Sequence, residues 1–188
     1  MTILGEAVVL AAVAVLVIGM VWGALSDLAS YEIPNTVSLV VAAAFVPAAL
    51  AAGLPLVQLA TAFAIAAACL VGGIGLYAVG LFGGGDVKLL SAGAVWAGAH
   101  GLASYLIAVA ISGGLLSLVL VIFRRLPLPA RLRRAAWVRG LHDRAAGVPY
   151  GVAIAAGAIA MVPELDVLAP LADGALLSQL ARLAGIVA

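Results

Sequence analysis

The stretch FGGGDVK at Phe82–Lys88 places a carboxylic acid, Asp86, in a chain that is otherwise apolar for tens of residues on either side. A carboxylate within a hydrocarbon layer costs about 2.5–3.5 kcal/mol on insertion scales, so an acid in such surroundings is expected to be functional. The three glycines before it carry no side chains, which lets a backbone, a water or a peptide come close to the carboxyl group. The alternative is structural, because aspartate is also a common N-cap of helices.

Composition assigns the whole chain to the membrane. Its 188 residues are 66% hydrophobic and only 9% charged, whereas a soluble domain has about 45–50% apolar and about 25% charged residues. This length leaves room for about six membrane-spanning helices, so we expect an all-α, polytopic helix bundle in one domain, residues 1–188. The single cysteine, Cys69, lies in an apolar run, which excludes an intrachain disulfide and a cysteine-based metal site.

The apolar runs predict where the spans lie. They cover about residues 3–26, 36–52, 56–82, 87–99, 102–123 and 148–162. We expect a turn at His100-Gly101 between the fourth and fifth spans. The first span has no basic residues before it, so we interpret it as a permanent helix and not as a signal peptide. After Pro163 come several acids and an apolar tail, residues 174–188, that suggests an interfacial helix.

Charge predicts the orientation of the bundle. Seven of the nine Lys and Arg residues fall between Arg124 and Arg144, and the positive-inside rule places such a short basic loop in the cytoplasm. With six spans, the loops after the first, third and fifth share one side. Asp27 and Asp86 then face the cytoplasm and the N-terminus lies outside. The basic loop is also expected to bind anionic lipid headgroups.

Asp27 is the candidate partner of Asp86, because it lies at the end of the first span, before Pro34 ends the element. Two carboxyl groups can hydrolyse an amide when one is ionised and activates water while the other is protonated and polarises the carbonyl. Asp86 precedes a predicted helix, whose amino end stabilises an anion, and Asp27 follows one. This favours Asp86 as the resting base and Asp27 as the resting acid. We expect no metal or other cofactor, since His100 is predicted at the opposite face and His142 stands alone in a basic loop.

Three motifs together carry a resemblance. Asp27 with Ile33-Pro34-Asn35, the glycines and Asp86 with Lys88, and VPYGVAIAAG at 148–157 resemble the type IV prepilin peptidases, the bacterial branch of the Gly-x-Gly-Asp (GxGD) intramembrane aspartyl proteases. The likeness is to the short members that serve Flp or tight-adherence pili. It implies that Asp27 and Asp86 are the catalytic pair. It also implies that the substrate is the leader of a pilin precursor, cut at the cytoplasmic face of the bacterial inner membrane. The larger members add an N-methyltransferase region with paired cysteines, and this chain has neither the length nor the cysteines.

The motifs also suggest which residues line the site. These are Gly83, Gly84, Gly85, Lys88, Pro34, Asn35, Pro149, Tyr150 and Gly151. Lys88 either tunes Asp86, meets a substrate charge or extends to lipid headgroups. Pro34 and Asn35 are expected to shape the loop that presents Asp27, and Asn35 can cap the second helix.

Two other classes of protein remain open at this point. A proton-coupled membrane carrier would use both acids as relay groups, but would place them in the middle of helices in both halves of the membrane. A non-enzymatic subunit of a pilus or secretion machine would use them as helix caps, and their substitution would be harmless. Nothing in the composition predicts a nucleic-acid partner.

Overall fold

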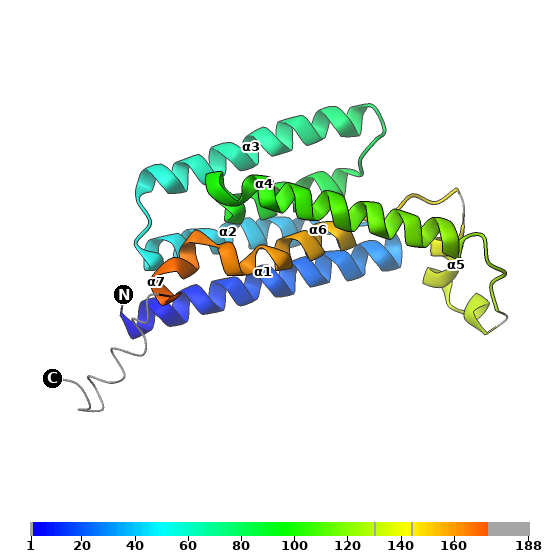
Figure 1. Cartoon of the computed structure of the whole chain (residues 1–188), viewed down its shortest axis with the longest axis horizontal. Coiled ribbons are helices and arrows are strands. Elements are labelled where there is room, and N and C mark those ends of the chain that lie inside the picture. The colour runs from blue at the N-terminus through cyan, green and yellow to red at the C-terminus, as the bar shows by residue number, and fades with distance from the viewer. Residues whose placement is uncertain (1, 130, 144, 173–188) are drawn as a thin grey trace.

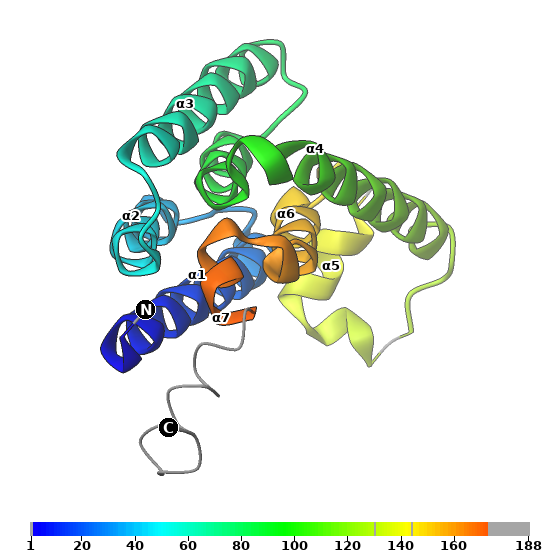
Figure 2. The ribbon, with the colours of Figure 1, turned by 60° about the vertical axis from the view of Figure 1, so that its left-hand side comes forward.

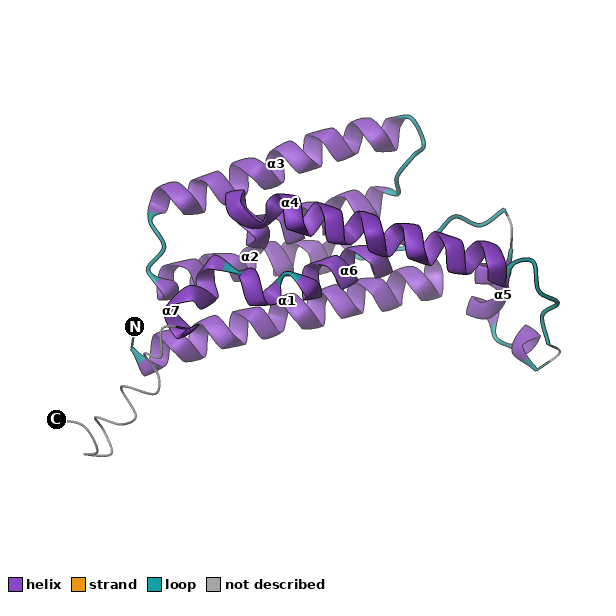
Figure 3. Cartoon of the chain, in the orientation of Figure 1, coloured by secondary structure: helices purple, strands orange, loops and turns teal. Residues whose placement is uncertain are grey.

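The computed structural model describes residues 2–172 apart from residues 130 and 144, and in this part helices joined by loops and turns are present and no strand is (Figure 3). The four long helices are α1 (Ile3–Ser30), α2 (Asn35–Ala52), α3 (Leu56–Ala78) and α4 (Gly84–Phe123). All four are long and apolar enough to cross a membrane. The shorter ones are α5 (Ala136–His142), α6 (Tyr150–Ala160) and α7 (Ala169–Ala172), with single 3-10 turns at Leu132–Arg134, Val162–Glu164 and Asp166–Leu168. The predicted helical membrane bundle is confirmed.

Helix α4 is two antiparallel arms joined at Gly98, whose backbone has the non-helical angles φ 58° and ψ −162°. The Tyr105 hydroxyl in the second arm donates a hydrogen bond of 3.2 Å to the carbonyl of Leu90 in the first. A straight helix would separate these two residues by about 22 Å, so the chain must fold back between them. Figures 1 and 2 show this reversal. The turn predicted at His100-Gly101 is therefore wrong, because both residues belong to the second arm.

The helix ends differ from the predicted spans where the sequence is uniformly apolar. α1 continues to Ser30, so Asp27 lies within its last turn and not beyond it. α3 ends at Ala78 and not at Phe82, because the chain turns at Gly80, which has a positive φ of 76°. α6 covers 11 residues, about 16 Å of helix, against the predicted span 148–162. It is too short to cross the hydrocarbon layer of about 30 Å by itself. The predicted tail at 174–188 lies outside the described residues.

Glycines let the helices of the bundle approach closely. A Cβ atom at Gly157 of α6 would lie 2.9 Å from the backbone nitrogen of Val109 in the second arm of α4. A Cβ at Gly73 of α3 would collide with the side chain of Val87 in the first arm. Such small residues are what helix contacts in membranes favour, since apolar side chains gain nothing there by leaving lipid.

The outer surface of the bundle suits a bilayer. Large apolar side chains are more than half exposed on every long helix, among them Ile18, Leu39, Val71 and Ile111. The chain is therefore a multi-pass membrane protein. Successive segments alternate in direction, so the end of α1, the start of α4 and the start of α6 lie at one end of the bundle with α5 (Figure 1). The N-terminus and α7 lie at the other end.

The backbone at Gly98 generates the first prediction. Its φ and ψ fall in a region that essentially only glycine occupies, so we expect Gly98→Ala to destabilise the fold by about 1–3 kcal/mol. Thermal unfolding of the purified protein in detergent measures this. The matched control is Gly101→Ala, since its added Cβ would meet nothing closer than Ala97 at 3.8 Å. Equal unfolding temperatures for the two variants would contradict the reversal at Gly98.

Candidate active site

Asp27 lies in the last turn of α1 and its side chain is 5% exposed. Its Oδ2 accepts a hydrogen bond of 2.7 Å from the backbone N–H of Gly151, the second residue of α6. The first N–H groups of a helix have no partner within that helix, and Pro149, the N-cap of α6, provides no side-chain bond. The Asp27 carboxyl group therefore meets the amino end of another helix, where a negative charge is stabilised.

Asp86 is the third residue of α4, whose N-cap is Gly83, and it is 9% exposed. Its Oδ2 folds back over Gly83, so that a Cβ there would lie 2.7 Å from this oxygen. An acid that reaches back from the third position to the N-cap resembles a capping box, which gives one oxygen a structural role. The other oxygen, Oδ1, is buried and has no hydrogen-bond partner among the described residues. A cap does not explain why this second oxygen is buried without a partner.

The two acids belong to one site. The Gly151 N–H donates its hydrogen bond to Asp27. The Asp86 carboxyl group lies close enough to interact electrostatically with that of Asp27. The assignment of the resting proton from the helix ends stays a prediction.

The glycines around the acids differ in what they face. A Cβ at Gly151 would lie 2.9 Å from both Cβ and Oδ2 of Asp27. Gly83 faces Asp86, as described above. Gly84 faces the ring of Tyr77, at 3.6 Å from its Cβ position, an ordinary contact on the side away from the acids. Only part of the glycine run therefore leaves room at the carboxyl groups.

Ile33 lies at the centre of the site, and the sequence analysis did not single it out as a site residue. Its side chain approaches the Cβ positions of three glycines from three helices, Gly23 of α1 at 3.7 Å, Gly85 of α4 at 3.1 Å and Gly151 of α6 at 3.1 Å. It fills the space that these glycines leave open. In a chain this apolar, its place directly before Pro34 was the only signal that could have found it.

Lys88 and Asn35 form a pair at the edge of the site. The Nζ of Lys88 donates a hydrogen bond of 2.7 Å to Oδ1 of Asn35, joining the start of α4 to the start of α2. The expectation that Asn35 caps α2 is wrong, since the N-cap is Pro34 and no side chain caps that end. An ammonium group has three donors, so Lys88 keeps capacity for a further partner.

Pro149 and Tyr150 bring the start of α6 beside the glycine run. Pro149 is buried, and the ring of Tyr150 packs on the ring of Phe82 with 5.5 Å between centroids. Tyr150 also covers Gly113 of α4, whose Cβ position lies 2.7 Å from the ring. Phe82 directly precedes the glycines, so this ring pair lies at the same end of the bundle as the acids.

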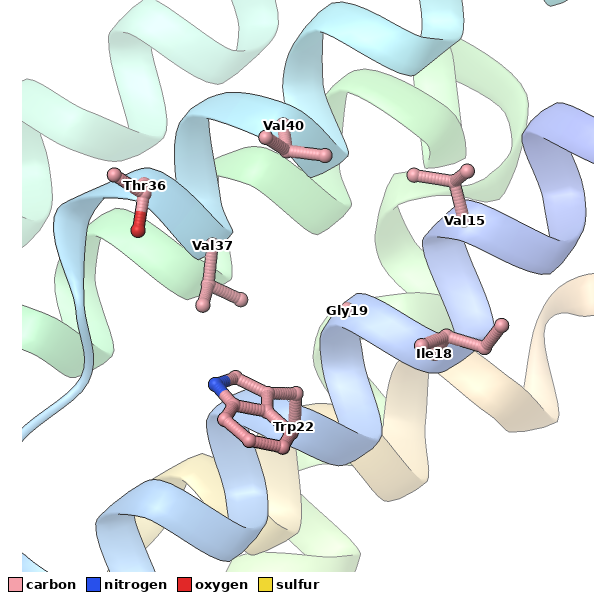
Figure 4. Close-up of a pocket in the computed structure, with 7 residues that line it drawn as sticks. All are labelled: Val15, Ile18, Gly19, Trp22, Thr36, Val37 and Val40. Carbon is pink, nitrogen blue, oxygen red and sulfur yellow. The ribbon is translucent and has the colours of Figure 1, made fainter.

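An open groove of about 280 Å³ lies between α1 and α2 (Figure 4). Its lining is almost entirely apolar and consists of Val15, Ile18, Gly19, Trp22, Thr36, Val37 and Val40. It contains no titratable side chain. The groove can therefore hold apolar groups but supplies no acid–base chemistry.

His100 lies at the far end of the bundle, where its Nδ1 is 3.5 Å from Oδ2 of Asp166. This pair lies at the opposite end of the bundle from Asp27 and Asp86. The prediction that His100 lies away from the two acids agrees with this position. Within the residues that the structure describes, no three His, Cys, Asp or Glu side chains gather as a metal site would need. The expectation of a metal-free reaction stays a prediction.

Comparison with known proteins adds one match. Residues 14–120 match the model of the family described as the type IV leader peptidase family, which confirms the resemblance drawn from the motifs. The matched range contains Asp27 and Asp86 and ends before α6. Neither the curated proteins nor the solved structures give a match.

The contact between Gly151 and Asp27 generates the second prediction. We expect Gly151→Ala to destabilise the fold by about 1–3 kcal/mol, because the new methyl would overlap Asp27 and Ile33 in a packed site. Gly147→Ala is the matched control, since no atom lies within 4 Å of its Cβ position. Thermal unfolding of both variants in detergent checks this, and an unchanged unfolding temperature for Gly151→Ala would show that α6 does not approach Asp27 as described.

Proposed function

Because the chain belongs to the type IV leader peptidase family, we propose that it is an aspartic endopeptidase that removes the leader of a pilin precursor, with Asp27 and Asp86 as the catalytic pair. The observation that carries this proposal is that two buried carboxyl groups from different helices lie close enough to interact, with one of them held by the N–H of Gly151. The family match covers both acids, and its description names a leader peptidase.

The proposed reaction needs one proton on the pair. The protonated carboxyl group donates a hydrogen bond to the scissile carbonyl, and the ionised one takes a proton from a water. The water oxygen bonds to the carbonyl carbon and gives a tetrahedral intermediate. The C–N bond then breaks as a carboxyl group passes a proton to the leaving amine. Both carboxyl groups are returned to their starting state when they exchange the remaining proton.

The surroundings of the pair suit an extended peptide. Gly83 carries no side chain at the Asp86 carboxyl group, which leaves room for a substrate backbone. Lys88 and Asn35 stand at the edge, where they can bind polar groups of the peptide. The arginine-rich segment lies at the same end of the bundle, and the positive-inside rule supports a cytoplasmic site in the bacterial inner membrane, with the N-terminus outside.

The alternatives make different demands on the two acids. A proton-coupled carrier would place relay acids along the membrane depth, whereas Asp27 and Asp86 lie in the last turn of α1 and the first turn of α4. The capping geometry of Asp86 is the one observation that favours a non-enzymatic subunit. It accounts for Oδ2 and leaves the buried Oδ1 unexplained.

The proposal predicts that Asp27→Asn and Asp86→Asn each lower leader cleavage by about 10²–10⁴-fold, because an amide can replace neither a proton donor nor a base. Each variant is expressed with candidate pilin precursors from the same genome, and cleavage is scored by gel mobility. Membrane levels of both variants should match wild type. The control is Glu32→Gln, an exposed acid on the loop between α1 and α2. Cleavage at the wild-type rate by either asparagine variant would exclude the paired-carboxyl mechanism.

Sidedness is a separate prediction. Reporter fusions after Arg144 should behave as cytoplasmic and fusions after Asp173 as extracytoplasmic, because the basic segment and the far end of the bundle lie on opposite sides. Alkaline phosphatase and a fluorescent protein give opposite readouts at each position. A cytoplasmic signal at both positions would place the acids and the tail on one side and remove the proposed topology.

A further inference from the structure

Arg124, directly after the last residue of α4, makes hydrogen bonds to two backbone carbonyls. Its Nε donates a hydrogen bond of 2.8 Å to the carbonyl of Leu141, and its Nη2 donates one of 2.8 Å to the carbonyl of Gly147. The side chain is half-buried, whereas the neighbouring Arg125 is exposed. The basic segment was expected to bind lipid headgroups, but this guanidinium is directed to backbone carbonyls of the segment that leads into α6.

The same guanidinium reaches the end of α1. It interacts with the side chain of Tyr31, whose ring also lies 3.6 Å from the Cβ position of Gly140. Partial burial raises the pKa of the Tyr31 phenol, so this group stays neutral beside the arginine. The N–H of Tyr31 donates a bond of 2.8 Å to the carbonyl of Asp27, with Tyr31 in the left-handed region at φ 57°. Tyr31 is therefore fixed to the turn that carries Asp27.

The second route from Arg124 to Asp27 runs through the start of α6. Gly147 is followed closely by the buried Pro149, whose ring fixes its φ, here −73°. Two residues later the N–H of Gly151 holds Oδ2 of Asp27. A displacement of Gly147 would thus be passed to Gly151 through a short and stiff connection. Both routes that begin at Arg124 end at Asp27, one at its backbone carbonyl and the other at its carboxyl group.

We propose that Arg124 is a positioning residue that fixes Asp27 from two sides, at its backbone through Tyr31 and at its carboxyl group through the 147–151 segment. The inference rests on the proposed function, since it assigns Arg124 to the geometry of a catalytic Asp27. Arginine suits this task because its planar group donates several hydrogen bonds in fixed directions and stays charged. Lysine offers a single flexible ammonium group and cannot hold three segments in the same way.

The structural part of the proposal, that the hydrogen bonds of Arg124 hold this segment in place, is tested without measuring activity. Limited trypsin digestion of the purified protein in detergent is compared for Arg124→Gln and for Arg125→Gln, so that each variant lacks one arginine. Cleavage after the exposed Arg131 and Arg134 reports opening of the chain segment that follows Arg124. We expect digestion there to be about tenfold faster in Arg124→Gln than in Arg125→Gln, because loss of hydrogen bonds from a charged group favours the open state. Equal digestion rates for the two variants would show that Arg124 does not hold the segment in place.

Kinetics test the consequence for Asp27. With a pilin precursor in detergent, Arg124→Gln should lower kcat by about 10- to 100-fold and leave KM within about twofold, since misplacement of a reacting group affects the chemical step. Arg125→Gln should retain both constants. Tyr31→Phe is a milder variant that keeps the fold, and it should lower kcat by about two- to fivefold with KM unchanged. Arg124→Lys should stay impaired, and full activity in this variant would show that only the charge matters.

The outcomes separate this inference from the proposed function. Loss of activity in Arg124→Gln through a raised KM, or wild-type kcat in both Arg124→Gln and Tyr31→Phe, would overturn the positioning role while the Asp27 and Asp86 variants still report on the peptidase. If the wild-type protein cleaves no precursor, the catalytic proposal and the positioning role fail together. The digestion rates would then still decide whether Arg124 holds the segment in place.

Discussion

The hydrogen bond from the Gly151 N–H to the Asp27 carboxyl group is the interaction on which the site depends. It exists because α6 begins with an unpaired N–H and because position 151 has no side chain to occupy the space that Asp27 needs. Asp86, at the start of α4, lies close enough to interact electrostatically with Asp27. The end of α1 is therefore held at the start of α6 by a backbone donor, whose position varies less than that of a side chain.

The membrane constrains how these ends can meet. A chain in hydrocarbon must satisfy its own backbone groups, so it can reverse only at the ends of helices or where protein covers the turn. The partly buried reversal at Gly98 lets one continuous α4 supply both Asp86, at the start of its first arm, and Arg124, directly after its second. The two arms run in opposite directions, which places both residues at the same end of the bundle. The second arm also packs on α6 through Gly157 and Val109, and so supports the helix whose N–H holds Asp27.

The sequence sufficed for the helical membrane class and for the placement of Asp27 and Asp86 at neighbouring helix ends, because composition and rare acids are strong signals in an apolar chain. Helix ends were predicted less well, since a run such as 56–82 contains little that marks where a helix must stop. The reversal at Gly98 was not predicted, because only the backbone angles of Gly98 distinguish it from Gly101. The glycine contacts of Ile33 and the bond between Lys88 and Asn35 were not predicted, because both depend on contacts between segments that are distant in the chain.

The basic segment shows that one residue can meet two demands. Counted as charges, its arginines favour a cytoplasmic location for this end of the bundle. Arg124 also donates hydrogen bonds to α5 and to the segment before α6, and it interacts with Tyr31 at the end of α1. A guanidinium suits both uses, because it donates in fixed directions and is weakly hydrated compared with an ammonium group. On the proposed topology and the proposed positioning role, the charge that orients the chain during insertion lies at the same end of the bundle as the two carboxyl groups.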